Sequence, residues 1–123
     1  MRVLVIDDEP SLSTLAVEYL RLCGHEAMAC ADGESALELL RRDSAFDVII
    51  LDQRLPGLSG ADTFRAIRSD PNLKKLPVIV LSSGIQPGAI PADLSQAEEH
   101  MSKPFHPKDL AAAVARLSRK DAP

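Results

Sequence analysis

The chain has 123 residues, of which 46% are hydrophobic and 26% are charged, and its formal net charge at pH 7 is -4. This length fits one domain, and the balanced composition excludes disordered and fibrous proteins. The acidic balance provides no basic surface for nucleic acid, so we expect no binding of DNA or RNA by this chain alone.

The apolar runs and the cysteines indicate where in the cell the protein is expected. No run approaches the ~20 apolar residues that cross a bilayer, and acidic residues follow the first apolar run too early for a secretion signal. We therefore expect a cytoplasmic protein without membrane contact. Cys23 and Cys30 have no metal-binding or redox spacing, which predicts two reduced, packed thiols.

The first part of the chain predicts two strand and helix pairs. Residues 2–7 form a strand in this prediction, and residues 10–23 form a helix, with Pro10 suited to its first turn and Gly24 to its end. A more polar stretch at 26–31 predicts an edge strand, and Asp32-Gly33 leads into a helix at 34–42. The expected inward faces of the two helices are Leu12, Leu15, Ala16, Tyr19, Leu20 and Cys23, and Leu37 and Leu40.

The middle of the chain continues this alternation. Residues 47–52 predict a strand buried on both faces, and Leu55-Pro56-Gly57 has the residues of a type II turn. A helix at 60–68 would bury Phe64 and Ile67, and Asp70-Pro71-Asn72 would end it. Residues 78–83 predict the next buried strand.

The last part of the chain is less regular. Pro87, Gly88 and Pro91 interrupt residues 84–94, so the fourth helix is expected to be short or irregular, near 91–97. A brief strand at 100–102 and a last helix with a clear apolar stripe follow, the stripe being Leu110, Ala113, Val114 and Leu117. The alternation predicts an α/β fold with a parallel sheet, as one domain at 1–118 with a flexible tail at 119–123.

Polar side chains end, or directly follow, three of the predicted strands. The carboxyl ends of parallel strands meet at one edge of the sheet, where open α/β folds bind ligands. We therefore expect one cluster of acids and hydroxyls, made of Asp7, Asp8, Asp52, Ser82 and Ser83. Carboxylates packed so closely repel one another, and a hard divalent cation such as Mg²⁺ would neutralise them.

Lys103 is a second candidate cation for the same edge. It follows the last predicted strand and precedes Pro104, and a cis bond before this proline would place the ammonium group over the acids. The competing interpretation is that residues 7–9 are ordinary helix-entry acids and that Asp52 only ends a strand. A carboxylate placed beside a cation and a hydroxyl can attack phosphorus, which would give an aspartyl phosphate.

These motifs together resemble the receiver domain of bacterial two-component response regulators. The resemblance covers essentially the whole chain and rests on Asp7-Asp8, Asp52, Leu55-Pro56-Gly57, Ser82 and Lys103-Pro104-Phe105. It implies a flavodoxin-like three-layer sandwich with a five-stranded sheet in the order 2-1-3-4-5. It also implies that a histidine kinase or a phosphotransfer protein phosphorylates Asp52.

The resemblance also assigns roles to single residues. Asp8 would bind Mg²⁺ directly and Asp7 through water, joined by Asp52 and the backbone carbonyl of Arg54. Lys103 would pair with a phosphoryl oxygen, with Pro104 in the cis form. Ser82 would move to hydrogen-bond the phosphoryl group, and Ser83 and His100 complete the candidate switch residues.

Three positions depart from the family pattern. His100 replaces the usual aromatic residue of the switch, and it is either a pH-sensitive substitute or a half-exposed polar strand residue. Arg54, two residues after Asp52, could contact the phosphoryl group or block water, which predicts an altered phosphate lifetime. The glycine- and proline-rich stretch 84–91 predicts a remodelled partner surface.

The expected function is a phosphorylation-dependent protein switch, either stand-alone or excised from a longer regulator. Its output would be binding to a downstream protein or to a second copy of itself. The alternative is a receiver-like interaction module that works without phosphate, although no acid or lysine of the motif set is lost. A hydrolase is the third class, but Arg54 stands where such an enzyme needs an acid, so we expect only self-phosphorylation and slow autodephosphorylation.

Overall fold

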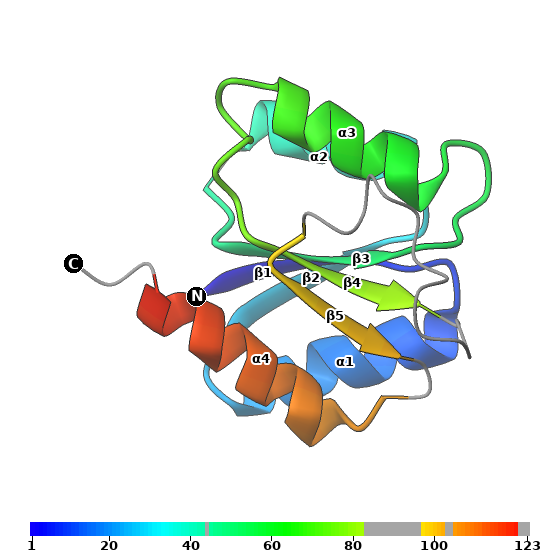
Figure 1. Ribbon diagram of the computed structural model, residues 1–123. Coiled ribbons are helices and arrows are strands. Elements are labelled where there is room, and N and C mark those ends of the chain that lie inside the picture. Colours follow the sequence, from blue (N-terminus) through cyan, green and yellow to red (C-terminus); the bar gives the residue numbers. More distant parts are fainter. Residues whose placement is uncertain (44, 83–96, 103–104, 121–123) are drawn as a thin grey trace.

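In a computed structural model of the chain, the described residues form five strands and four helices (Figure 1). The structure describes residues 1–43, 45–82, 97–102 and 105–120. The predicted short helix near 91–97 falls almost entirely outside these residues.

The strands form one parallel sheet in the order β2-β1-β3-β4-β5, as the resemblance implies. The strands are β1 (Arg2–Ile6), β2 (Glu26–Cys30), β3 (Val48–Asp52), β4 (Val78–Ser82) and β5 (Glu99–Ser102). All residues of β3 and β4 are buried, because helices cover both faces of the sheet. β2 lies at one edge, as its more polar sequence predicts.

The helices form the two outer layers. α2 (Gly33–Arg42) and α3 (Gly60–Ser69) cover one face, and α1 (Pro10–Leu22) and α4 (Pro107–Lys120) cover the other (Figure 1). Each face has its own apolar cluster. Leu40, Phe64 and Ile67 belong to the α2 and α3 layer, and Leu20, Leu110 and Val114 belong to the α1 and α4 layer.

The inward face of α1 differs from the sequence prediction. Its buried residues are Ser13, Ala16, Val17 and Leu20. Leu15 is 44% exposed and Cys23 is also exposed, so these two predicted core positions are wrong. A serine fits the buried stripe because Ser13 Oγ donates a hydrogen bond to the carbonyl oxygen of Pro10, at 3.3 Å.

The other predicted faces are confirmed. Leu37 and Leu40 of α2, Phe64 and Ile67 of α3, and the whole apolar stripe of α4 are buried. α4 is assigned through Lys120, and the division into a domain at 1–118 and a tail at 119–123 stays a prediction. None of the helices in the described part of the chain has the length and hydropathy that a membrane crossing requires.

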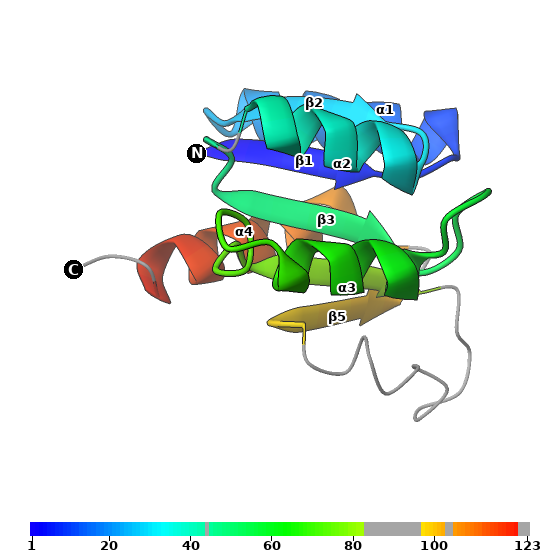
Figure 2. The same ribbon diagram turned by 90° about the horizontal axis from the view of Figure 1, so that it is seen from above.

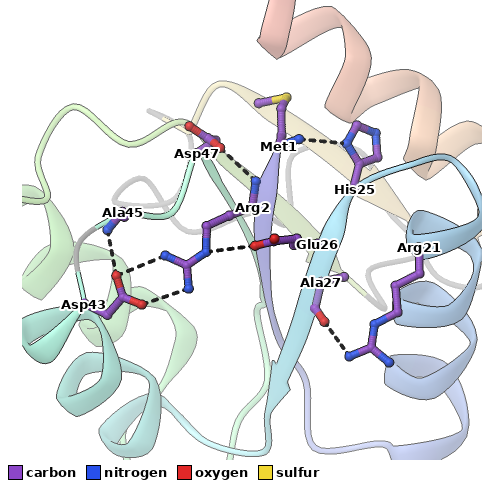
Figure 3. A network of polar contacts seen from close by, with 9 residues as sticks. All are labelled: Met1, Arg2, Arg21, His25, Glu26, Ala27, Asp43, Ala45 and Asp47. Carbon is purple, nitrogen blue, oxygen red and sulfur yellow. Dashed lines mark hydrogen bonds and ion pairs between the residues drawn. The ribbon is translucent and has the colours of Figure 1, made fainter.

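A network of charged side chains surrounds Arg2 at the amino-terminal edge of the sheet, where the strands begin (Figure 3). The Arg2 guanidinium donates two hydrogen bonds to the Asp43 carboxylate, at 3.0 and 2.8 Å, and lies 3.3 Å from a Glu26 oxygen. It also lies over the Phe46 ring, 4.5 Å from its centroid. The Arg2 hydrogen bonds hold the pKa of Asp43 below its ordinary value. Ion pairs thus stabilise the amino-terminal edge of the sheet. The acids that follow or end the strands lie at the opposite, carboxyl edge.

Candidate functional site

Three carboxylates meet at the carboxyl edge of the sheet. Asp7 and Asp8 follow β1, Asp52 is the last residue of β3, and each offers an oxygen within 4.8 Å of the other two. Asp7 and Asp52 are each 3% exposed, whereas Asp8 is exposed. The cluster therefore joins two buried acids to one that solvent reaches.

The register of the sheet produces this cluster. β1 and β3 pair in parallel with Ile6 opposite Leu51, so the next residues on the two strands are Asp7 and Asp52. The amide of Asp7 donates to the carbonyl oxygen of Cys30 at 3.0 Å, which extends the pairing of β1 with β2 by one residue. Neighbouring strands in a parallel sheet lie about 4.8 Å apart, so these side chains are brought together by the backbone itself.

Backbone amides orient the two buried carboxylates. Asp7 Oδ1 accepts a hydrogen bond from the amide of Glu9 at 2.9 Å, and Asp52 Oδ1 accepts one from the amide of Arg54 at 3.1 Å. These bonds fix the orientation of each carboxylate relative to the backbone that follows its strand.

The helix-entry interpretation of residues 7–9 does not account for this arrangement. α1 begins at Pro10 without an acidic residue in its first turn, and Glu9 at its N-cap position makes no capping hydrogen bond with its side chain. The Asp7 carboxylate is also buried, directly after the last residue of β1. The acid pair is placed by the end of β1.

A cavity of about 180 Å³ adjoins the acids. The thiol of Cys30 lies in its wall, and the sequence did not predict this. Asp7, Asp8, Ser13 and Cys30 contribute to its lining. Cys30 is half-buried and packs against the apolar cluster of the α2 and α3 layer, and burial together with the charge of Asp32 raises the pKa of its thiol. The thiol therefore stays protonated near neutral pH, and a neutral thiol is a poor metal ligand.

Of the other predicted site residues, the structure describes Ser82, Arg54 and His100. Ser82 ends β4 and is 5% exposed, and the β3 and β4 register sets Leu81 opposite Asp52, so Ser82 is one residue beyond. Arg54 and His100 are exposed, the latter on β5 opposite Val80 of β4. Ser83, Lys103 and Pro104 lie outside the described residues, and their roles stay predictions.

Two glycines shape the loop between β3 and α3. Gly57 has a φ of 69°, the positive value predicted for the Leu55-Pro56-Gly57 turn. A Cβ atom on Gly60 would lie 2.5 Å from the Asp52 carbonyl oxygen and 2.6 Å from that of Gln53. Glycine at 60 therefore lets α3 start directly against the backbone of the site.

The donor set fits a hard divalent cation. Three oxygen-bearing side chains lie close enough for one ion, and carboxylate oxygens are the ligands that Mg²⁺ and Ca²⁺ prefer. Mg²⁺ keeps several waters and needs few protein ligands, which suits a site with one exposed acid.

Comparison with known proteins agrees with this geometry. The chain matches the model of the response regulator receiver domain over residues 3–115. It is 36% identical over 122 residues to the DNA-binding response regulator MtrA of Mycolicibacterium smegmatis, an alignment that covers 98% of this chain and 52% of that protein. The chain thus spans about half the length of the curated relatives that it matches.

Solved structures show the same fold. The chemotaxis response regulator CheY4 of Vibrio cholerae superposes with a TM-score of 0.86 at 29% identity, covering 94% of this chain and 97% of that one. The receiver domain of the sensor histidine kinase PA1611 of Pseudomonas aeruginosa, solved with a magnesium ion coordinated in its active site cleft, gives a TM-score of 0.79 at 28% identity over 94% of this chain and 95% of its own. Sequence match, strand order and acid cluster agree, and the chain belongs to the response regulator receiver domain family.

Proposed function

We propose that the chain is the phosphoacceptor of a two-component phosphorelay and that Asp52 takes the phosphoryl group. The observation that carries this proposal is the cluster of Asp7, Asp8 and Asp52 at the carboxyl edge of the sheet. A histidine kinase or a phosphotransfer protein would supply the phosphoryl group, in the cytoplasm. The chain would have no substrate other than its own aspartate.

The metal in this proposal is Mg²⁺. Asp8 would bind it directly and Asp7 through water, with Asp52 and the backbone carbonyl of Arg54 completing the protein ligands. A bound Mg²⁺ supplies positive charge against the phosphoryl oxygens and against the three acids. The family likeness and the magnesium ion held by the PA1611 receiver domain support this choice.

The chain's own residues carry the transfer. A carboxylate oxygen of Asp52 forms a bond to phosphorus while the bond from phosphorus to the donor atom breaks, and the donor leaves with the electron pair of that bond. The amide of Arg54 orients the Asp52 carboxylate through its 3.1 Å hydrogen bond. Lys103 would stabilise the phosphoryl oxygens, with Pro104 in the cis form fixing its approach.

Ser82 and its neighbours would convert phosphorylation into a change of surface. The phosphoryl group adds charge and acceptor oxygens beside Ser82, whose hydroxyl would turn to donate a hydrogen bond. Ser83 and the exposed His100 on β5 would follow this movement. The output would be binding of a downstream protein or of a second copy of the chain, either alone or as the receiver half of a longer regulator.

Labelling with a small phosphodonor tests this proposal. We expect acetyl phosphate with Mg²⁺ to add one phosphoryl group per chain, stable in acid and labile in base, and EDTA to prevent the addition. Asp52→Asn, which keeps the side-chain volume, should remove the label. Absence of labelling in the wild-type chain would favour a phosphate-independent interaction module, and continued turnover of the donor would favour a hydrolase.

Arg54 is proposed as a modulator of phosphate lifetime. The Arg54 side chain is exposed, and the backbone amide of the same residue donates a hydrogen bond to Asp52 Oδ1. The guanidinium would contact the phosphoryl group or exclude the attacking water. Autodephosphorylation of Arg54→Asn should differ from that of the wild-type chain, and equal rates would remove the proposal.

A further inference from the structure

Glu34 connects the start of α2 to the loop that follows Asp52. It is the second residue of α2, and its Oε1 accepts a hydrogen bond from the amide of Leu58 at 2.9 Å. Leu58 belongs to residues 53–59, the loop between β3 and α3, and its side chain packs against the apolar cluster of the α2 and α3 layer. The carboxylate of one helix thus holds the backbone of a loop that belongs to the site.

The adjacent residue shows how close this contact is. A Cβ atom on Gly57 would lie 3.0 and 3.2 Å from the two carboxylate oxygens of Glu34. Gly57 also has a φ of 69°, which other residues rarely adopt. Two successive residues of the loop are therefore fitted to the Glu34 carboxylate.

Both ends of the same loop are fixed to the site and to α3. The amide of Arg54 donates to Asp52 Oδ1, and the amide of Gly60 donates to the carbonyl oxygen of Gln53 at 3.2 Å. Ser59 Oγ caps α3 by accepting a hydrogen bond from the amide of Asp62 at 3.1 Å. Between these two ends, the loop is also held by Glu34 of α2, which accepts the hydrogen bond from the Leu58 amide.

We propose that Glu34 is a positioning residue, which holds the loop so that the Arg54 carbonyl binds the cation with little further ordering. This inference rests on the proposed function, because it needs Arg54 to be a metal ligand. A loop released from α2 would have more conformations to lose when the ion binds, so the affinity for Mg²⁺ would fall. The contact acts on the ligand set through the backbone, without Glu34 touching the ion.

Two substitutions separate this role from a simple charge effect. Glu34→Ala removes both the acceptor and the negative charge, whereas Glu34→Gln removes the charge but keeps a carbonyl oxygen that can accept from the Leu58 amide. Glu38→Ala is the matched control, because Glu38 is an exposed glutamate one turn further along the same helix. All three variants change the net charge equally.

Calorimetric titration with Mg²⁺ is the measurement, since the chain has no tryptophan for a fluorescence readout. We expect Glu34→Ala to raise the Kd for Mg²⁺ roughly three- to tenfold, as the loss of one ordinary hydrogen bond would. Glu34→Gln and Glu38→Ala should bind within about twofold of the wild-type chain. With saturating Mg²⁺, all three should accept phosphate from acetyl phosphate at the wild-type rate.

The melting temperature without Mg²⁺ completes the test. Because the contact with the Leu58 amide is formed without the ion, Glu34→Ala should melt below Glu38→Ala, and Glu34→Gln should melt close to Glu38→Ala. An affinity of Glu34→Ala equal to that of Glu38→Ala, or of Glu34→Gln as weak as that of Glu34→Ala, would overturn the role of Glu34. A wild-type chain that neither binds Mg²⁺ nor takes the label would contradict the proposed function as well, so the two failures are distinguishable.

Discussion

Glycine residues set how closely α3 approaches the strand that ends in Asp52 and how closely α2 approaches α3. A Cβ atom on Gly60 would meet backbone carbonyl oxygens, and a Cβ atom on Gly33 at the start of α2 would lie 2.1 Å from Thr63 Oγ1 on α3. Thr63 is fully buried, and its hydroxyl donates to the carbonyl oxygen of Ser59 at 2.8 Å, so it has little freedom to move. The two helices beside the site are packed against each other at these residues.

Gly33→Ala should therefore destabilise the fold through Thr63. We expect the substitution to lower the free energy of unfolding by about 1–3 kcal/mol, the usual range for overpacking. Most of this loss should disappear when Thr63→Ala is also present, because the clashing oxygen is gone. Urea denaturation of the four chains of this double-mutant cycle measures the coupling.

Thr63→Ser is the control for this cycle. It keeps the hydroxyl and its hydrogen bond to Ser59, so Gly33→Ala should remain as destabilising as in the wild-type chain. An equal effect of Gly33→Ala in all three backgrounds would show that the close approach of α2 and α3 is not what limits position 33.

The sequence predicts the acids of the site but not their supporting contacts. Asp7, Asp8 and Asp52 follow strongly apolar runs, so strand ends alone bring them to one edge. The contacts of Glu34 with Leu58 and of Gly33 with Thr63 depend on how α2 lies against α3, which no local pattern encodes. Cys30 was missed because the sequence shows its spacing but not the cavity beside it.

At the scale of elements, α2 begins with a side-chain cap. Asp32 accepts a hydrogen bond from the amide of Ser35 at 2.7 Å. This backbone hydrogen bond is the main cause that lowers the pKa of Asp32 below its ordinary value, and a hydrogen bond with the Ser35 side chain lowers the pKa further. The charged cap therefore stabilises the start of the helix that carries Glu34.

The contribution of this cap should depend on pH in a defined direction. Because the pKa of Asp32 is lower in the folded chain, its stabilisation is complete above the ordinary aspartate pKa of about 3.9 and is lost as the pH falls through the folded-state pKa. We expect Asp32→Ala to lower the melting temperature at pH 7, with the difference from the wild-type chain shrinking below pH 4.

Asp32→Asn separates the hydrogen bond from the charge, because its side-chain oxygen still accepts from the Ser35 amide. This variant should stay closer to the wild-type melting temperature than Asp32→Ala at pH 7. A difference between Asp32→Ala and the wild-type chain that stays constant from pH 7 to pH 3 would contradict the capping role.

Periodicity predicted the inward face of α4 correctly and that of α1 only in part. α4 has one apolar stripe, and all four of its predicted core residues are buried. α1 has leucines on two adjacent faces, and the stripe that packs on the sheet includes Ser13 in place of Leu15. A hydrophobic pattern cannot decide between adjacent faces, since the choice depends on the surface that the helix covers.

A pair of leucines tests these assignments. Leu110 in α4 is fully buried, so Leu110→Ala should lower the free energy of unfolding by about 2–5 kcal/mol. Leu22 at the end of α1 is 85% exposed, so Leu22→Ala should change it by less than about 0.5 kcal/mol. Chemical denaturation measures both, and similar losses for the two variants would contradict the described packing.

At the scale of the whole molecule, the parallel sheet separates structural from chemical polar groups. Ion pairs around Arg2 lie at the amino-terminal edge (Figure 3). The acids lie at the opposite edge, where β1 and β3, which run in the same direction in Figure 2, end. Alternating strands and helices predicted the α/β class from periodicity, whereas the strand order came from the family resemblance. Neither source predicts the described contacts of single side chains.

Chemical trapping tests directly whether Asp52 receives the phosphoryl group. Borohydride reduces an acyl phosphate to an alcohol, so a phosphorylated Asp52 would become homoserine, which peptide mass spectrometry locates. After treatment with acetyl phosphate and Mg²⁺, we predict homoserine at position 52, and none after treatment with EDTA or in Asp52→Asn. Homoserine at another position, or none in the wild-type chain under these conditions, would contradict phosphorylation of Asp52.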